Sequence, residues 1–227
     1  MNFTVTSTKC SKAGHREFRV RGESPALKQD AEWLIEYLES SVLNGTNFTV
    51  GETIQMGWMI NRVEEGDGGL LIISEPDFEH LPIAFIPSVT KTLFHLRIQK
   101  DTADSLGLLD QLTLPSVCDA VSVTANWALS SRLQMFRIEP VGAHSGWVVE
   151  EVHSGEHDER NLGQSKLISL YELALVRPEF VPFFALPQRI RISGIPTKNP
   201  EIFLADERIE FAPTSFLARY LDRDRSV

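Results

Sequence analysis

The chain contains 227 residues, of which 42% are apolar, and its formal net charge at pH 7 is −9. This length is enough for one large domain or two small ones, each with its own hydrophobic core. No run of about 18 or more apolar residues occurs, so the sequence predicts no membrane-spanning helix.

The start of the chain and its cysteines predict a cytoplasmic protein. The first residues are polar and lack the apolar stretch of a secretory signal. Cys10 and Cys118 are far apart and match no zinc or redox spacing. We therefore expect two reduced thiols.

Alternation and helical periodicity organise the first half of the chain. Residues 16–22 alternate as a short strand, and residues 25–43 have the apolar spacing of an amphipathic helix. Trp33 and Tyr37 lie beside this apolar stripe, so we expect them to widen the buried face of the helix.

A hairpin and a second helix are expected next. Residues 53–63 and 69–74 are predicted strands joined by a glycine-rich turn at Asp67, so that 53–74 forms a β-hairpin. A helix over 88–105 follows. Residues 109–115 have the composition of a linker, which predicts an N-terminal domain of residues 1–114 and a C-terminal domain of residues 115–227.

The second half is expected to be richer in strands. The predicted strands cover residues 119–125, 133–139, 145–152, 188–193 and short pieces near 201–211, with a helix near 166–176 and a charged, frayed tail from Arg219. The fold class is therefore α+β, with small mixed or antiparallel sheets, a few packed helices and two subdomains.

The negative charge is concentrated in two segments. Residues 63–90 contain six acids and residues 138–159 contain six more, and neither segment has a lysine or arginine. Local fields of this kind steer charged partners, and they repel the phosphates of nucleic acid. We expect a positively charged protein partner and no nucleic-acid or membrane partner; two solvated loops are the plainer interpretation.

The most distinctive segment is 144–159. A short apolar strand containing Trp147 runs into Glu150 and Glu151, and a Ser-Gly turn and a cluster of acids and histidines follow. A strand that leads into an acidic loop presents charge in a fixed geometry. The loop then either holds a cation or meets a cationic partner.

The order of motifs in this half resembles a known family. The segments are Ala120-Val-Ser-Val, Leu133-Gln-Met-Phe-Arg-Ile-Glu-Pro, Ser145-Gly-Trp-Val, Ser154-Gly-Glu-His-Asp and Ile168-Ser-Leu. Their order is similar to that of bacterial immunity-protein family thirty-three, over about residues 119–193. The pattern departs from the family at His144, where an aspartate is usual, and the first half is not covered.

The resemblance implies a cytosolic antitoxin of a polymorphic-toxin system in interbacterial competition. Such a protein binds and occludes a cognate toxin, needs no cofactor and is not an enzyme. The acidic surface would suit a basic toxin, such as a nuclease with a cationic cleft. Monomer and homodimer both remain open, as does an adaptor or scaffold role for a secreted effector.

The expected partner-binding residues come from both acidic segments, the second of which includes the strand that contains Trp147. They are Glu75, Asp77, Trp147, Glu150, Glu151, Glu156, Asp158 and Glu159. Tryptophan is enriched in binding hot spots, although a tryptophan packed on the sheet is the more common case. Arg189 and Arg191 share a strand face and offer a competing interpretation, in which they neutralise the acidic loop within the molecule.

Two enzymatic or metal-dependent alternatives also start from this loop. His144, His153 and His157 lie among carboxylates, and imidazole with carboxylate suits zinc. However, the Ser-Gly turn breaks the helical spacing of the last two histidines, and no metalloprotease motif is present. The Gly-Ala-His-Ser-Gly segment has its serine one place too late for a nucleophile elbow. We therefore predict neither a metal site nor a catalytic residue.

Overall fold

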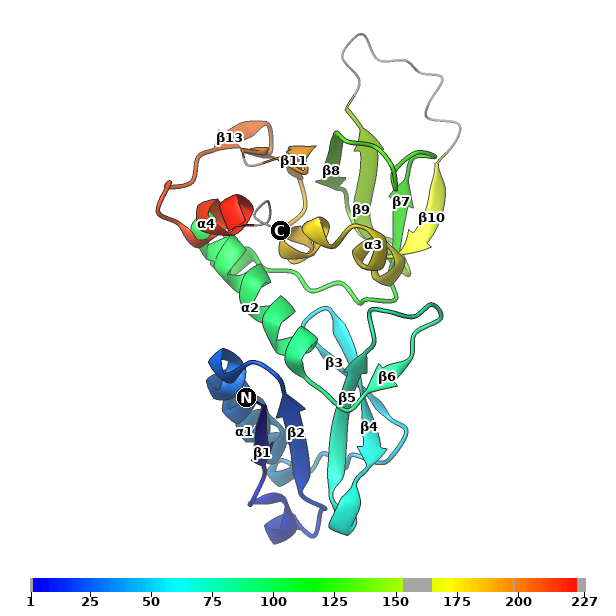
Figure 1. Cartoon of the computed structure of the whole chain (residues 1–227), viewed down its shortest axis with the longest axis vertical. Helices are drawn as coiled ribbons and strands as arrows, with labels where there is room; N and C mark the ends of the chain where they lie inside the picture. The colour runs from blue at the N-terminus through cyan, green and yellow to red at the C-terminus, as the bar shows by residue number, and fades with distance from the viewer. Residues whose placement is uncertain (1, 153–164, 198, 224–227) are drawn as a thin grey trace. The chain divides into compact units, whose positions relative to one another are not determined.

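The structure is a computed structural model that describes residues 2–152, 165–197 and 199–223 (Figure 1). The chain divides into two compact units, residues 1–97 and 98–227. Each unit has a mixed sheet of its own, which confirms the α+β fold class. Within the described residues, no helix combines the length and the apolarity needed to cross a membrane.

The first unit is built on a six-stranded sheet with the order β1-β2-β5-β4-β3, in which β6 also pairs with β5. Strands β2 and β5 are parallel, and the other pairs are antiparallel. The elements are β1 (Phe3–Thr6), η1 (Cys10–Ala13), β2 (Phe18–Gly22), η2 (Pro25–Leu27), α1 (Lys28–Leu43), β3 (Thr53–Met56), β4 (Met59–Glu65), η3 (Asp67–Gly69), β5 (Leu71–Pro76), β6 (Phe85–Ile86) and α2 (Thr90–Ser105).

Helix α1 covers β1 and β2 with the apolar stripe that the sequence indicates. Leu34 and Leu38 on this stripe are completely or almost completely buried. The expectation for Trp33 and Tyr37 was wrong, because their side chains are 59% and 48% exposed and stack on each other on the outer side of the helix. At four residues apart they share a face that the apolar stripe does not include.

The predicted strand over 53–63 is two strands. Gly57 has φ of 65°, and Met56 pairs with Met59, so the chain reverses at Gly57 and Trp58. Glycine allows this left-handed conformation, and a two-residue turn suits the twist of paired strands. The expected hairpin through Asp67 forms between β4 and β5.

The second unit contains a seven-stranded sheet with the order β10-β7-β9-β8-β11-β12-β13. Strands β7 and β9 are parallel, and the other pairs are antiparallel. Its elements are η4 (Leu109–Gln111), β7 (Ala120–Val123), β8 (Leu133–Arg137), β9 (His144–Glu151), β10 (Lys166–Ser169), α3 (Leu170–Val176), η6 (Pro178–Phe183), β11 (Ile190–Ile195), β12 (Glu201–Leu204), β13 (Glu207–Ile209) and α4 (Phe216–Arg223).

Two expectations for the C-terminal half need correction. The helix near 166–176 begins only at Leu170, after Ser169 accepts a hydrogen bond from the amide of Glu172, and the four residues before it form edge strand β10. The charged tail contains α4, because Leu217 is buried and its amide donates to Ser105 Oγ.

The two compact units meet in the sequence at residues 97 and 98, whereas the sequence predicted a boundary at 114/115. Their junction lies within α2, whose last turns belong to the second unit. There Gln99 donates to the carbonyl of Val181 (3.0 Å), and Ser105 holds the start of α4. The change in composition after α2 marks where this helix ends. It does not show that the last turns of the helix pack in the second unit.

A buried guanidinium joins three segments of the second unit. Arg137, at the end of β8, is 4% exposed, and it donates to the carbonyls of Ser145 (3.2 Å) and Leu186 (2.6 Å) and contacts Thr113 Oγ1. Its guanidinium also lies 5.4 Å from the ring of Trp147. Burial lowers the pKa of Arg137 to about 10, against an opposing effect of Asp119, so the group is still charged at neutral pH.

Replacing Arg137 by alanine should destabilise the second unit by about 2–4 kcal/mol, because several buried acceptors lose a charged donor at once. Urea unfolding at neutral pH measures this change. Arg132→Ala is the matched control, since Arg132 is exposed and should have an effect below about 0.5 kcal/mol. Equal effects of the two variants would contradict the role given to Arg137.

His95 gives the first unit a specific response to acid. Its ring lies 5.4 Å from the rings of both Trp58 and Phe78, and burial, assisted by the charge of Lys91, lowers its pKa to about 3. An unfolded histidine has a pKa of about 6.5. The unfolded state therefore binds more protons between these values, so stability should fall as pH drops below about 6.5.

His95→Gln should reduce this loss of stability between about pH 6.5 and pH 5. Unfolding free energies from urea titrations at several pH values measure the slope. His80→Gln is the control, because the side chain of His80 is 64% exposed. A slope that is unchanged by His95→Gln would refute the assignment.

Candidate functional site

The seven-stranded sheet of the second unit has one buried face and one open face. The buried face packs against α3 and η6, and Trp147 Nε1 donates to the carbonyl of Phe184 just after η6 (3.1 Å). Its side chains are apolar and are Val121, Val123, Leu133, Met135, Trp147, Val149, Ile190 and Ile192. The alternating residues of β7, β8 and β11 point to the other face, and none of them is buried.

One row of side chains crosses the whole open face, and we call it the central row. Cross-strand partners share a face, so the register alone aligns these residues. From β10 to β13 the central row is Leu167, Ser122, Val148, Phe136, Arg191, Phe203 and Arg208. It combines apolar groups with two arginines.

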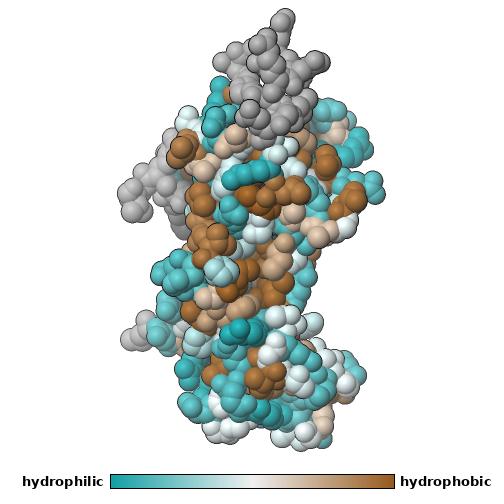
Figure 2. Space-filling model, turned by 90° about the vertical axis from the view of Figure 1, so that its right-hand side faces the viewer, coloured by the Kyte–Doolittle hydropathy of each residue, from teal (hydrophilic) through white to brown (hydrophobic). Residues whose placement is uncertain are grey.

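A second row, the polar row, lies two residues further along the strands. It contains Glu150, Gln134, Ser193 and Glu201. The Gln134 amide donates to the Glu150 carboxylate, and Ser193 Oγ donates to Gln134 Oε1 (3.2 Å). These hydrogen bonds fix the geometry of Glu150 but leave its negative charge in place. Figure 2 shows hydrophobic and hydrophilic residues interspersed over the part of the molecular surface that faces the viewer.

The open face contains a serine–histidine pair whose geometry does not suit base catalysis. His144 Nε2 lies 3.0 Å from Ser122 Oγ, while His144 Nδ1 accepts a hydrogen bond from the amide of Gly146 (2.9 Å). A neutral imidazole that accepts at Nδ1 carries its proton on Nε2. Nε2 therefore donates to the serine and is not placed to remove its proton.

Two predicted partner-binding residues are not available to a partner. Trp147 is completely buried on the closed face of the sheet, where it packs beneath Arg137. Glu75 is 1% exposed, and its carboxylate accepts from the amide of Thr92 in the first turn of α2 (2.7 Å). Both expectations were wrong, since a strand pattern does not distinguish a core tryptophan from a surface one, and a buried carboxylate can serve the free amides of a helix start.

Four of the six acids in segment 63–90 are engaged by groups of the same fold. Glu65 pairs with both terminal nitrogens of Arg16 (2.5 and 3.0 Å), and this hydrogen-bonded pair lowers the pKa of Glu65. Glu64 contacts the guanidinium of Arg62. Asp77 accepts from His80 Nδ1 (2.6 Å) and is mostly buried, with a 16% exposed side chain. The prediction of an unpaired anionic surface over this segment is corrected.

The second acidic segment is described only in part. Glu150 and Glu151 lie at the end of β9 and are partly exposed. Glu156, Asp158 and Glu159, and the histidines His153 and His157, lie outside the described residues. Over the residues that the structure does describe, no group of three or more His, Cys, Asp or Glu side chains comes together to hold a metal ion.

The competing role for the two arginines involves three acids that lie outside the described residues, so it stays a prediction; the described Glu150 and Glu151 form no ion pair with either arginine. Arg189 precedes β11 with φ of 66°, so it does not continue the strand, and only Arg191 points to the open face. The Arg191 guanidinium lies 4.2 Å from the ring centroid of Phe203. It is therefore held by an aromatic ring.

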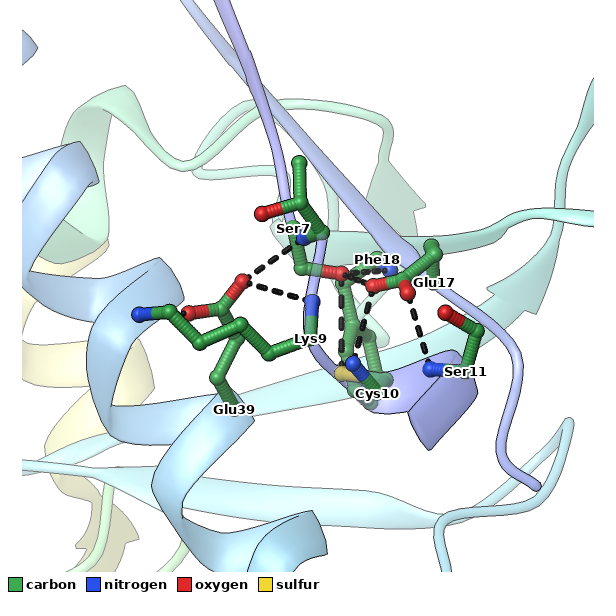
Figure 3. A network of polar contacts seen from close by, with 8 residues as sticks. Ser7, Lys9, Cys10, Ser11, Glu17, Phe18 and Glu39 are labelled. Carbon is green, nitrogen blue, oxygen red and sulfur yellow. Dashed lines mark hydrogen bonds and ion pairs between the residues drawn. The ribbon is translucent and has the colours of Figure 1, made fainter. Parts of the chain in front are cut away.

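A polar network near the N-terminus contains a cysteine, a serine and a carboxylate (Figure 3). The Ser7 hydroxyl bonds to the Glu17 carboxylate, accepts from the amide of Phe18 (2.7 Å) and lies 3.6 Å from Cys10 Sγ. Cys10 is completely buried, and burial raises the pKa of its thiol. A buried thiol with a raised pKa is a poor nucleophile, so the network stabilises the fold.

A small cavity in the second unit is lined mainly by apolar groups. Its volume is about 60 Å³, and its lining includes Phe183, Pro196, Tyr220 and the carboxylate of Glu179. Glu179 already accepts from Arg177 Nε (2.5 Å). The cavity therefore offers little polar chemistry.

Comparisons with protein families, curated proteins and solved structures find no match for this chain. The functional argument therefore depends on the chain's own surfaces. The open face was not predicted as a site, because the strand register that aligns the central row and the polar row cannot be derived from local patterns. The alternation in residues 133–137 and 190–195 is the only signal that points to it.

Glu17 makes the N-terminal network sensitive to strong acid. Burial alone would raise its pKa, but hydrogen bonds from the Ser7 hydroxyl, Ser11 and the Cys10 amide outweigh that effect and lower the pKa to about 2. The folded-state pKa is thus below the unfolded value of about 4.3. This contribution is complete above the unfolded value and is lost as pH falls toward 2.

Glu17→Gln should lower the stability of the first unit at pH 7 and flatten its pH dependence between about 4.3 and 2. Urea unfolding across this range tests the prediction. Glu52→Gln is the control, since Glu52 is exposed and accepts only from the nearby amide of Thr49 (2.7 Å). If both variants keep the wild-type slope, the depressed pKa is not a source of stability.

Proposed function

We propose that this chain is an immunity protein that binds and occludes a cognate toxin through the open face of its seven-stranded sheet. The observation that carries the proposal is the central row, a continuous line of half-exposed apolar and charged side chains across seven strands. A face with this mixture suits protein recognition, in which apolar contacts give affinity and charges give orientation.

The family resemblance supports the same proposal from the sequence. Its described motifs cover β7, β8 and β9 and reach the end of β10, and these four strands are neighbours in the sheet that carries the open face. Glu150 then lies at the edge of the docking surface, and Glu151 follows it at the end of β9, where its cross-strand partner is Leu133 of the closed face. A basic toxin would be attracted to this edge, and an interface of standard size would bury about 800 Å² on each partner.

Co-expression with the toxin encoded beside this gene tests the class of function. The immunity protein should restore the growth of cells that produce the toxin, whereas an adaptor binds the effector without rescue. Binding without rescue would reject the immunity proposal and favour the adaptor. The absence of both would reject the interaction.

Neutralising the two carboxylates at the end of β9, beside the docking surface, should slow association. Glu150→Gln together with Glu151→Gln should lower the association rate constant about 3- to 10-fold at low salt and weaken its dependence on ionic strength. Stopped-flow binding to the toxin measures both effects. The matched control is Glu32→Gln with Glu36→Gln, two exposed carboxylates on α1. If the control pair slows association equally, the effect comes from net charge and not from this surface.

A further inference from the structure

Arg191 occupies a special place in the central row. It lies on β11, an interior strand of the sheet, and its Cα partners are Phe136 on β8 and Phe203 on β12. Its guanidinium lies over the Phe203 ring, 4.2 Å from the centroid. A stacked guanidinium is held in a limited set of rotamers while its N–H edge is still able to donate.

Arg191 is one of the described arginines whose charge is not compensated by an ion pair. Five other arginines form ion pairs with carboxylates, and they are Arg16, Arg62, Arg97, Arg177 and Arg208. Among the described residues, none supplies a carboxylate within ion-pair distance of Arg191. Glu201, the nearest acid in the polar row by register, pairs with Arg208 instead (3.5 Å).

The open face also contains a fixed charge of the opposite sign. Glu150 lies on β9, two strands away from β11, and in the polar row, two residues along from the central row. Neighbouring strands are about 4.8 Å apart and residues rise about 3.3 Å along a strand, so the two positions are about 12 Å apart. The hydrogen bond from Gln134 orients the carboxylate, and the Phe203 ring orients the guanidinium.

We propose that Arg191 is the anion-recognition residue of the docking surface, and that the partner protein places a carboxylate side chain against it and a cationic side chain against Glu150. The partner's two groups should then lie about 12 Å apart, the spacing that strand geometry gives for their counterparts. A guanidinium that is already stacked donates two parallel hydrogen bonds to a carboxylate, which a lysine does not reproduce. This inference rests on the proposed function only for the statement that the partner is a toxin.

A short peptide tests the recognition itself without the toxin. The capped peptide Ac-Lys-Leu-Thr-Leu-Glu-NH₂ places its two charged side chains on one face of an extended chain, about 13 Å apart. Added at millimolar concentration to the ¹⁵N-labelled full chain, it should shift the Arg191 Nε–H signal and the amides of Phe136 and Phe203. Replacing the peptide's Glu by Gln should weaken binding at least 5-fold.

Two variants of the protein make the result specific. Arg191→Lys should weaken peptide binding at least 5-fold, whereas Arg208→Lys, on the same row but already paired with Glu201 and Glu210, should leave it within 2-fold. No shift at Arg191, or equal binding of the Glu and Gln peptides, would overturn the proposal. Inorganic phosphate and an eight-nucleotide oligothymidine are further probes, and tighter binding of either one would show that the site recognises phosphate.

A charge exchange with the toxin separates this inference from the proposed function. Arg191→Glu should weaken toxin binding at least 10-fold, and a toxin variant with arginine in place of the contacting carboxylate should restore it. If the wild-type chain rescues growth and Arg191→Glu binds the toxin normally, the anion-recognition role fails while the immunity function stands. If the peptide binds as described but no toxin is neutralised, the reverse holds.

Discussion

The second unit depends on the burial of one side of its sheet and on the guanidinium that closes that side. Arg137 reaches from the end of β8 to carbonyls on β9 and after η6, so it holds the sheet against the segment beneath it. A buried charge with only neutral acceptors is expensive to leave unsatisfied, which makes this arrangement specific. The fully buried apolar side chains of the sheet lie on the closed side, whereas the open face combines apolar, polar and charged side chains that are exposed or half-buried.

Charged side chains have two different roles in the two units. In the first unit, Glu17, Glu65 and Glu75 serve amides and guanidiniums of the same fold. On the open face of the second unit, Glu150 and Arg191 are oriented by neutral neighbours, an amide and a phenyl ring, and keep their charge. Groups that a fold orients without neutralising are suited to meet an external partner, and this contrast underlies both proposals.

The sequence predicted the elements better than their environments. The apolar stripe of α1 and the alternation of β8 and β11 are local patterns, so they indicate structure directly. The sequence did not show that Trp33 is exposed and Trp147 is buried, because a tryptophan beside a helical stripe or within a strand can be either. The pairing of Glu65 with Arg16 joins residues far apart in the chain, as does the register of the central row, and no local pattern contains such information.

The most direct measurement of the central claim is growth rescue by a chain altered at the exposed end of the central row. Leu167 is 66% exposed on edge strand β10, so Leu167→Glu changes the open face without disturbing the core. The account predicts that this variant folds, binds the toxin at least 10-fold more weakly and loses rescue, while Leu129→Glu, at a 92% exposed position outside the sheet, rescues fully. Full rescue and unchanged toxin affinity with Leu167→Glu would contradict the claim that the open face is the docking surface.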